Sequence, residues 1–202
     1  MKLYYAPGTC ALACWISLRW AGAEFDVAKA DFASAEFRRV NPLAAVPALD
    51  LDGERAMTQC SAILDWIAGH YPEARLGHDG SEQDHFRFAE TMAFLTGDFH
   101  PAFWPYFTPQ RYTTDASSEA LDKVRAASAP RIDRVMTHLD RLIGEGRHVH
   151  GDQRSVADAY AYAMARWTRP MAKSWKHYPG ISRLFGWMEE DADVREVLEL
   201  SA

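Results

Sequence analysis

The sequence of 202 residues lacks long apolar runs, abundant cysteine and an excess of positive charge. No apolar stretch approaches the roughly 18 residues that a membrane-spanning helix needs, and the first residues show no signal-peptide cleavage pattern. Lys and Arg number 22 against 28 Asp and Glu, so the formal net charge is −6, without a basic stripe that would bind phosphates. These absences predict a cytoplasmic protein that binds neither membranes nor nucleic acid.

Cysteine is scarce, and its spacing matches no common structural site. Cys10, Cys14 and Cys60 form an odd set without the spacing of a disulfide framework or a zinc site. Two short stretches combine His with acidic residues, "HDGSEQDH" and "HVHGD", yet neither has a clear third and fourth ligand. The sequence therefore predicts free thiols, solvated histidines in loops and no metal ion.

The first third of the chain alternates strand-like and helical patterns. A short β-prone run, "KLYYA", is followed by a helical pattern that Gly22 ends, and "FDVAKAD" predicts a second strand. A short helix ends at the Asn41-Pro42 step, because the residue before proline avoids helical geometry. Asp52-Gly53 predicts a two-residue turn between antiparallel strands, and "TQCSAILDWIAGHYP" predicts a helix. The order is β-α-β, then a helix, then β-β-α.

A segment with the composition of a linker follows, from Pro72 to Gln83. It contains two Gly, one Pro and several charged residues. We therefore expect two domains, residues 1–75 and residues 84–202.

The patterns after this segment are all helical. Apolar residues at helical spacing predict two long helices that pack together, the first of which Pro101 and Pro105 should bend or end. The segment from Pro105 to Ser117 is expected to form a loop over a cleft. "SVADAYAYAMARW" predicts a helix that buries one face and begins with a Ser155-Asp158 capping box, and a last helix begins at "PGISRL".

Three motifs carry a resemblance to a known family: "YYAPGTCALA", "VNPLAAVPALD" leading into "MTQCSAILDWI", and "GDQRSVADAYAYAMARW". In this order and spacing they are similar to the cytosolic glutathione transferases, and most of all to the bacterial Beta class. The resemblance spans essentially the whole chain. It implies an α/β thioredoxin-like N-terminal domain that binds glutathione as co-substrate, an all-α C-terminal domain that lines a second-substrate pocket, and a homodimer.

Cys10 is the candidate nucleophile. It lies where a strand passes into a helix, and the free N–H groups and dipole of a helix N-terminus favour a thiolate. The resemblance implies that this cysteine contacts the glutathione sulfur and can form a mixed disulfide with it. The alternative is a small buried hydrophobic residue, the usual place of a free cysteine. Cys14, one helical turn further on, has no C-x-x-C partner and is expected to be a core residue.

The resemblance assigns further glutathione contacts to two segments. Val46-Pro47 matches the family's cis-proline step, where the backbone of the residue before proline pairs with the cysteinyl part of glutathione. Gln59 and Cys60 match an acid-or-amide plus hydroxyl pair at a helix start, which receives the γ-glutamyl carboxylate. The hydroxyl is missing here, so either the Cys60 backbone N–H makes that contact or glutathione binds less tightly. Alternatively, Gln59 only caps the helix and Cys60 only packs.

Three residues of the helical part complete the candidate site. His100 matches a histidine near the glutathione sulfur, although a lone His beside an apolar stripe is also a common structural residue. Asp98 matches an acidic residue that reaches glutathione across the dimer interface; its alternative is a solvated helix charge. Trp167 matches an aromatic residue of the second-substrate pocket, with a place in the core as the alternative.

The sequence departs from the family pattern at positions that bear on binding. Leu43 stands where Beta-class enzymes often have Lys, and Ala93 where they often have Asn, which removes two polar contacts. We predict a transferase that uses Cys10 to pass glutathione to an apolar electrophile or to carry out thiol-disulfide exchange. The alternative is a non-catalytic, transferase-like scaffold whose helical domain binds a protein partner. Ser155 and Asp158 are expected to govern folding and not chemistry.

Overall fold

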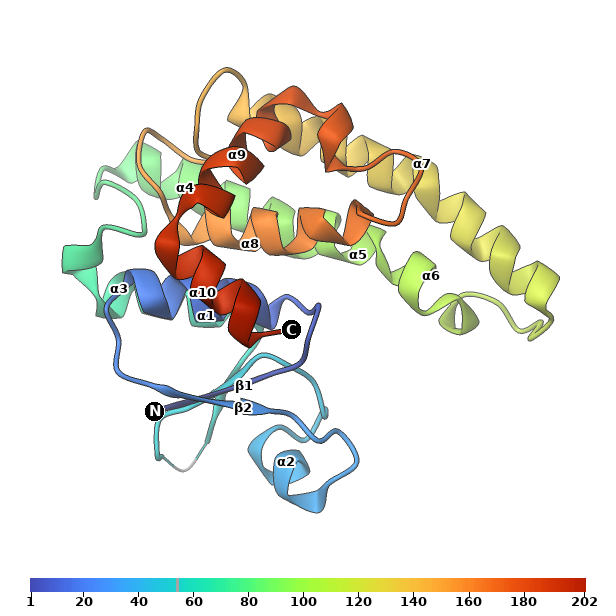
Figure 1. Cartoon of the computed structure of the whole chain (residues 1–202), viewed down its shortest axis with the longest axis horizontal. Coiled ribbons are helices and arrows are strands. Elements are labelled where there is room, and N and C mark those ends of the chain that lie inside the picture. Colours follow the sequence, from blue (N-terminus) through green and yellow to red (C-terminus); the bar gives the residue numbers. More distant parts are fainter. Residues whose placement is uncertain (54) are drawn as a thin grey trace.

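The first part of the chain forms a four-stranded sheet with helices on both faces (Figure 1). The computed structural model describes residues 1–53 and 55–202. The elements of this part are β1 (Lys2–Tyr5), α1 (Ala11–Trp20), β2 (Asp26–Lys29), α2 (Ala35–Val40), β3 (Ala48–Asp50), β4 (Met57–Thr58) and α3 (Cys60–His70). The strand order is β2-β1-β3-β4, with β1 parallel to β2 and antiparallel to β3. The predicted β-α-β and β-β-α units are confirmed.

Local signals in the sequence set the bounds of these elements. Ser34 caps α2 by accepting a hydrogen bond from the Phe37 N–H at 3.0 Å, and Asn41 ends that helix in an extended conformation. Gly22 takes a φ of 64° just beyond α1, which glycine adopts without steric cost. Helix α2 covers one face of the sheet, where the Phe37 ring lies 5.5 Å from that of Tyr4, and α1 packs with α3 on the other face.

The connection between β3 and β4 is longer than a two-residue turn. The two strands are antiparallel, as expected, but both are short. The Asp50 carboxylate accepts the Asp52 N–H at 3.0 Å, and this local bond turns the chain out of the ladder. Asp52, with a φ of 60°, takes the left-handed conformation expected of Gly53. The tight turn predicted there is therefore wrong.

The rest of the chain is helical and forms a second layer beside the sheet (Figure 1). Its elements are η1 (Pro72–Ala74), α4 (Glu82–Phe94), η2 (Leu95–Phe99), α5 (His100–Ala102), α6 (Trp104–Phe107), η3 (Pro109–Arg111), α7 (Ser118–Ile143), α8 (Val156–Ala165), η4 (Arg166–Thr168), η5 (Trp175–His177), α9 (Pro179–Glu190) and α10 (Ala192–Leu200). Within residues 1–53 and 55–202, none of these helices combines the length and the apolar character that crossing a membrane requires. The predicted fold class is confirmed.

The first long helix changes form before its prolines. Helix α4 ends at Phe94, and a π-helical turn, η2, carries the chain to Phe99, directly before His100. Pro101 has no N–H to donate to the preceding turn, so a regular helical ladder cannot pass through it. The segment from 105 to 117 is not simply a loop, because α6 and η3 make it partly helical. Short helical turns therefore border the cleft described below.

Helix α8 is buried on every side, not on one. All of its 10 residues are buried, because the helix lies between α1 and α9 at the centre of the molecule (Figure 1). Alanine occupies alternate positions of "VADAYAYAMA", and its small side chain lets neighbouring helices approach from any direction. The one-sided burial predicted from apolar spacing is therefore wrong.

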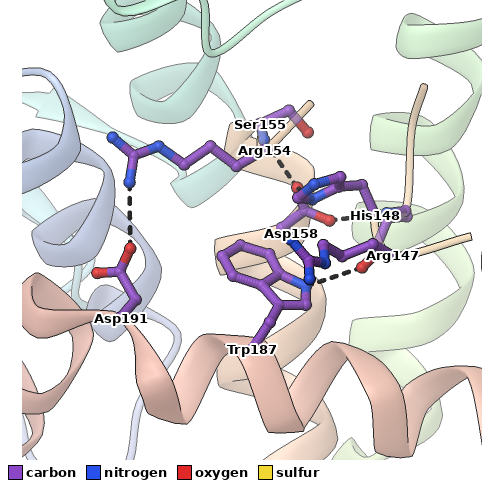
Figure 2. A network of polar contacts seen from close by, with 8 residues as sticks. Arg147, His148, Arg154, Ser155, Asp158, Trp187 and Asp191 are labelled. Atoms are coloured by element: carbon purple, nitrogen blue, oxygen red, sulfur yellow. Dashed lines mark hydrogen bonds and ion pairs between the residues drawn. The ribbon is translucent and has the colours of Figure 1, made fainter. Parts of the chain in front are cut away.

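A buried polar network holds the N-terminal end of α8 (Figure 2). The Asp158 carboxylate accepts hydrogen bonds from the backbone N–H groups of Ser155 and Val149, both at 2.7 Å. The acidic arm of the predicted capping box is thus present. The Ser155 side chain faces the Asp158 N–H, so both arms of the predicted capping box are present, although Ser155 Oγ makes no hydrogen bond of normal geometry among the described residues. Asp158 is the member of the pair on which the helix start depends.

The histidines of "HVHGD" are not solvated, contrary to the prediction. The His148 side chain is 10% exposed and its Nδ1 lies 3.3 Å from the Asp158 carboxylate, whereas Nε2 of His150 lies 3.0 Å from that of Asp84. Because the Val149 N–H donates to the Asp158 carboxylate, this segment folds back onto the helical layer and leaves each ring only 10% exposed. Each ring has its own carboxylate, and no three His, Cys, Asp or Glu side chains within the described ranges are arranged to hold a metal ion.

Candidate active site

A cleft of about 570 Å³ opens where the N-terminal ends of α1 and α3 face the helical layer. Residues from both parts of the chain line it. Of the predicted site residues it brings together Cys10, Val46, Pro47, Gln59, Cys60, His100 and Trp167. Asp98 lines a different groove.

Cys10 lies directly before α1, beside the cleft. Gly8, with a φ of 72°, turns the chain between β1 and α1, so that Cys10 occupies the helix N-terminus as predicted. The side chain is 6% exposed, and Sγ lies 3.9 Å from the Val46 carbonyl oxygen. The thiol is therefore shielded from bulk water while it borders the space that a ligand would enter.

The loop before β3 is held by one side chain, Asn41. Its Nδ2 donates to the Ala45 carbonyl oxygen at 2.7 Å, and its Oδ1 accepts from the Leu43 N–H at 3.1 Å. The Val46-Pro47 peptide bond that follows is cis, as the resemblance predicts. The sequence indicated only that Asn41 ends a helix, because its hydrogen bonds across the loop depend on how the loop folds.

The start of α3 presents backbone N–H groups to the cleft. Gln59 precedes the helix with a φ of 71°, a left-handed conformation that costs free energy in a non-glycine residue and is often found at functional sites. Its side chain makes no capping hydrogen bond, so the alternative in which Gln59 serves only as a cap does not hold. Ser61 also lines the cleft, one position after Cys60. A hydroxyl is thus present at this helix start, shifted by one residue, which the letters "QCS" could have signalled.

Cys60 lies between the other two cysteines. Its Sγ is 3.4 Å from the Cys10 carbonyl oxygen and 3.7 Å from Cys14 Sγ. Burial, and then the neighbouring thiols, raise the pKa of Cys60 well above its ordinary value, so its thiol is protonated at neutral pH. Cys14 is fully buried in the core, as predicted, and all three cysteines are free.

His100 and Tyr160 form a pair on the helical side of the cleft. His100 Nδ1 lies 3.3 Å from the Tyr160 hydroxyl. Burial lowers the pKa of His100 to about 4, so the ring is neutral at neutral pH. Burial, and then the thiols of Cys60 and Cys10, raise the pKa of Tyr160, whose hydroxyl keeps its proton. The sequence did not identify Tyr160 as a site residue, because it lies among the apolar residues of a predicted helix face.

Aromatic rings close the helical side of the cleft. The Trp167 ring lies 5.0 Å from that of His100 and 5.5 Å from that of Phe107. Trp167 Nε1 donates to the Gly8 carbonyl oxygen at 2.7 Å. Trp167 therefore lines the pocket and also ties η4 to the turn that precedes Cys10.

Charged groups are sparse in the cleft. Among the described residues that line it, Arg111 of η3 is the one with a formal charge. The sequence did not predict a site role for Arg111, because the residue lies in a segment expected to be a loop. Leu43, 75% exposed, puts an apolar side chain at the same cleft. Asp98 is exposed and lines a separate groove of about 830 Å³ between η2 and α7, whose α7 side carries Arg131 and Arg134.

Comparisons with known proteins agree along the whole chain. Family models for the glutathione S-transferase N-terminal and C-terminal domains match residues 8–70 and 122–196. Glutathione S-transferase GST-4.5 of Xanthomonas campestris pv. campestris is 32% identical over 202 residues, which cover 98% of each chain. The structure of a sphingomonad glutathione S-transferase complexed with glutathione is 33% identical, with a TM-score of 0.85 over 100% of this chain and 98% of that one. A bacterial beta class glutathione S-transferase of Sphingomonas chungbukensis is also 33% identical, with a TM-score of 0.86 over 100% and 99% of the two chains.

Proposed function

The chain belongs to the glutathione S-transferase family of enzymes, and on that premise we propose that it is a cysteine-type transferase in which Cys10 reacts with glutathione and its disulfides. The observation that carries this proposal is the position of the Cys10 thiol, at a helix N-terminus and beside the cleft. Free N–H groups there stabilise a thiolate, which is the reactive form of cysteine.

Glutathione is the proposed co-substrate, and three features of the cleft suit it. The free N–H groups at the start of α3, from Cys60 and Ser61, suit its γ-glutamyl carboxylate. The backbone of Val46, which lines the cleft, is proposed to pair with its cysteinyl part. Arg111 attracts its net negative charge. The sphingomonad relative with bound glutathione supports the same choice.

The proposed reaction with disulfides is an exchange. The Cys10 thiolate attacks the glutathione sulfur of a mixed disulfide, forms a Cys10-glutathione disulfide, and releases the other sulfur as a thiolate that takes up a proton. A second glutathione thiolate then attacks the glutathione sulfur of that adduct, and Cys10 leaves as a thiolate. One disulfide is reduced and one molecule of glutathione disulfide forms.

Transfer of glutathione to an apolar electrophile is proposed for the same cleft. Phe107, Trp104 and Trp167 offer an apolar surface beside Cys10. A protonated Tyr160 that donates to His100 Nδ1 leaves His100 Nε2–H as a neutral donor toward the sulfur. A neutral ring orients and donates without adding positive charge.

Replacing Cys10 by serine should abolish the reaction with glutathione disulfides while leaving glutathione binding largely unchanged. Cys10→Ser should lower the rate of thiol-disulfide exchange by at least about a hundredfold and abolish any glutathione adduct. Affinity for glutathione should stay within about threefold, because the start of α3 and the Val46 backbone are unchanged. Stopped-flow exchange assays, intact mass and retention on immobilised glutathione measure the three quantities. An unchanged exchange rate would make Cys10 a packing residue and favour the non-catalytic scaffold.

The remaining features of the proposed enzyme concern its assembly and setting. We propose a homodimer in which the face around Asp98 meets a second copy, so that Asp98 reaches the partner's cleft. Sedimentation at micromolar concentration tests this, and a monomer with full activity would remove that role of Asp98.

We also propose two domains, 1–75 and 84–202, and a cytoplasmic location, where a cluster of free cysteines stays reduced.

A further inference from the structure

The three cysteines form a row that leads from the cleft into the core. Cys10 and Cys60 border the cleft and are each 6% exposed, whereas Cys14 is fully buried. The Cys60 Sγ lies 3.7 Å from the Cys14 Sγ and 3.4 Å from the Cys10 carbonyl oxygen. Cys60 is therefore the middle thiol of the row.

We propose that Cys60 and Cys14 act as a resolving pair behind Cys10, which removes glutathione from the Cys10 adduct and takes up the disulfide itself. This inference rests on the proposed function, because it needs an adduct at Cys10. It adds a dithiol route to a site that would otherwise act with a single cysteine.

The chemistry balances with glutathione disulfide as the oxidant. The Cys10 thiolate attacks glutathione disulfide, forms the adduct and releases one glutathione thiolate. The Cys60 thiolate attacks the Cys10 sulfur, forms a Cys10-Cys60 disulfide and releases the second glutathione. The Cys14 thiolate then attacks the Cys60 sulfur, forms a Cys14-Cys60 disulfide and frees Cys10. Two protein thiols are oxidised, one glutathione disulfide is reduced to two glutathione molecules, and the protons of the two protein thiols pass to them.

The geometry favours this order of steps. A disulfide needs its sulfur atoms about 2 Å apart, so the Sγ atoms of Cys14 and Cys60, now 3.7 Å apart, must approach by roughly 1.7 Å. Cys14 has no exposed surface, so an external disulfide meets Cys10 or Cys60 first. The buried pair can be oxidised only through the cysteines that border the cleft.

The environment of Cys60 affects both the rate and the direction of exchange. The groups that face it are Cys10, directly before α1, Cys14 of α1 and Tyr160 of α8. Burial raises the pKa of the Cys60 thiol, which makes it slow to attack at neutral pH and a poor leaving group once it is in a disulfide. We therefore expect the adduct to resolve faster as the pH rises, with Cys60 remaining in the product disulfide.

The test is to treat the reduced protein with glutathione disulfide and follow its intact mass. The wild type should lose two hydrogens and retain no glutathionyl group. Cys60→Ser should keep one glutathionyl group on Cys10, and the wild-type adduct should disappear at least about tenfold faster than that of the variant. Cys14→Ser should stop at a Cys10-Cys60 disulfide. Fragmentation of the peptide between Lys2 and Arg19, which carries both Cys10 and Cys14, identifies the cysteine joined to Cys60.

Different failures have different meanings in this experiment. A wild type that keeps the glutathionyl group as long as Cys60→Ser does would overturn the resolving pair and leave the Cys10 chemistry intact. A wild type that ends with a Cys10-Cys60 disulfide would overturn the role of Cys14. If neither protein gains an adduct or a disulfide, Cys10 is unreactive and the proposed function itself fails. The wild-type measurements stand by themselves, so they remain decisive even if a variant folds poorly.

Discussion

Buried polar groups on α8 play two different roles, one where the helix begins and one where it borders the cleft. At the N-terminal end, Asp158 accepts two backbone N–H groups and pairs with His148, so its carboxylate is satisfied within the protein (Figure 2). Two residues further on, Tyr160 lines the cleft and its hydroxyl lies 3.3 Å from His100 Nδ1, and the thiols nearby have weak partners at 3.4 Å or more. At the helix start the paired carboxylate adds stability, whereas the weakly paired groups at the cleft remain available to a ligand.

The largest effect on stability is expected at the N-terminal end, from Asp158→Ala. The change leaves two buried N–H groups without acceptors, so the free energy of unfolding should fall by about 3 kcal/mol. Ser155→Ala is the matched control and should cost less than about 0.5 kcal/mol, because Ser155 Oγ lacks a partner with normal geometry among the described residues. Urea unfolding measures both values. Equal losses would mean that the serine hydroxyl caps the helix after all.

A smaller effect, dependent on pH, is expected from His100. Its folded pKa of about 4 lies below the value of about 6.5 expected for an unfolded chain. Between these values the unfolded state binds more protons, so stability is complete above pH 6.5 and falls as the pH drops toward 4. His100→Gln should therefore lose about 2 kcal/mol less than the wild type between pH 7 and pH 5.

Urea unfolding at the two pH values tests this expectation for His100. The histidine ring signals in NMR spectra provide an independent check, because the one that disappears in His100→Gln should titrate near pH 4. A titration of that signal near 6.5 would show that the ring is solvated, and would remove the neutral-donor role proposed for it.

The smallest effects are expected from a matched pair of tryptophans, Trp167 of η4, which follows α8, and Trp187 of α9. Trp167 Nε1 donates to the Gly8 carbonyl oxygen at 2.7 Å, and Trp187 Nε1 to that of Arg147 at 2.8 Å. Trp167→Phe should raise the KM for glutathione by about three- to fivefold, because it loosens the turn before Cys10. Trp187→Phe should lower stability by about 1 kcal/mol and leave KM unchanged. Steady-state kinetics measure the effect on KM, and thermal melts measure the effect on stability. A raised KM for Trp187→Phe with an unchanged KM for Trp167→Phe would contradict these assignments.

Local patterns predicted the parts of the site that lie close together in the sequence. The turn at Gly8 and the helix after it place Cys10 at a helix start, and both are determined by neighbouring residues. The family motif predicted the cis step at Pro47, which no local preference would have indicated. The sequence did not predict that Tyr160 and Arg111 line the cleft, because they do so through contacts with residues far away in the chain.

The failed expectations have a related cause. Apolar spacing predicted one buried face for α8, but the helix is surrounded because α1 and α9 pack on opposite sides of it. His148 was expected to be solvated and is buried, because its loop folds back onto Asp158. Spacing along a helix reports which residues avoid water but not how many neighbours the helix will have.

By itself, the sequence determined the order of strands and helices, the position of Cys10 before a helix and the family to which the chain belongs, because turn residues, caps and motifs act over a few positions. Only the tertiary structure decided that Cys60 lies between Cys10 and Cys14, and that Tyr160 meets His100. These contacts join α1 to α3 and α8 to α5 across long stretches of chain. Their distances follow from how helices pack, and packing depends on the shapes of many side chains together.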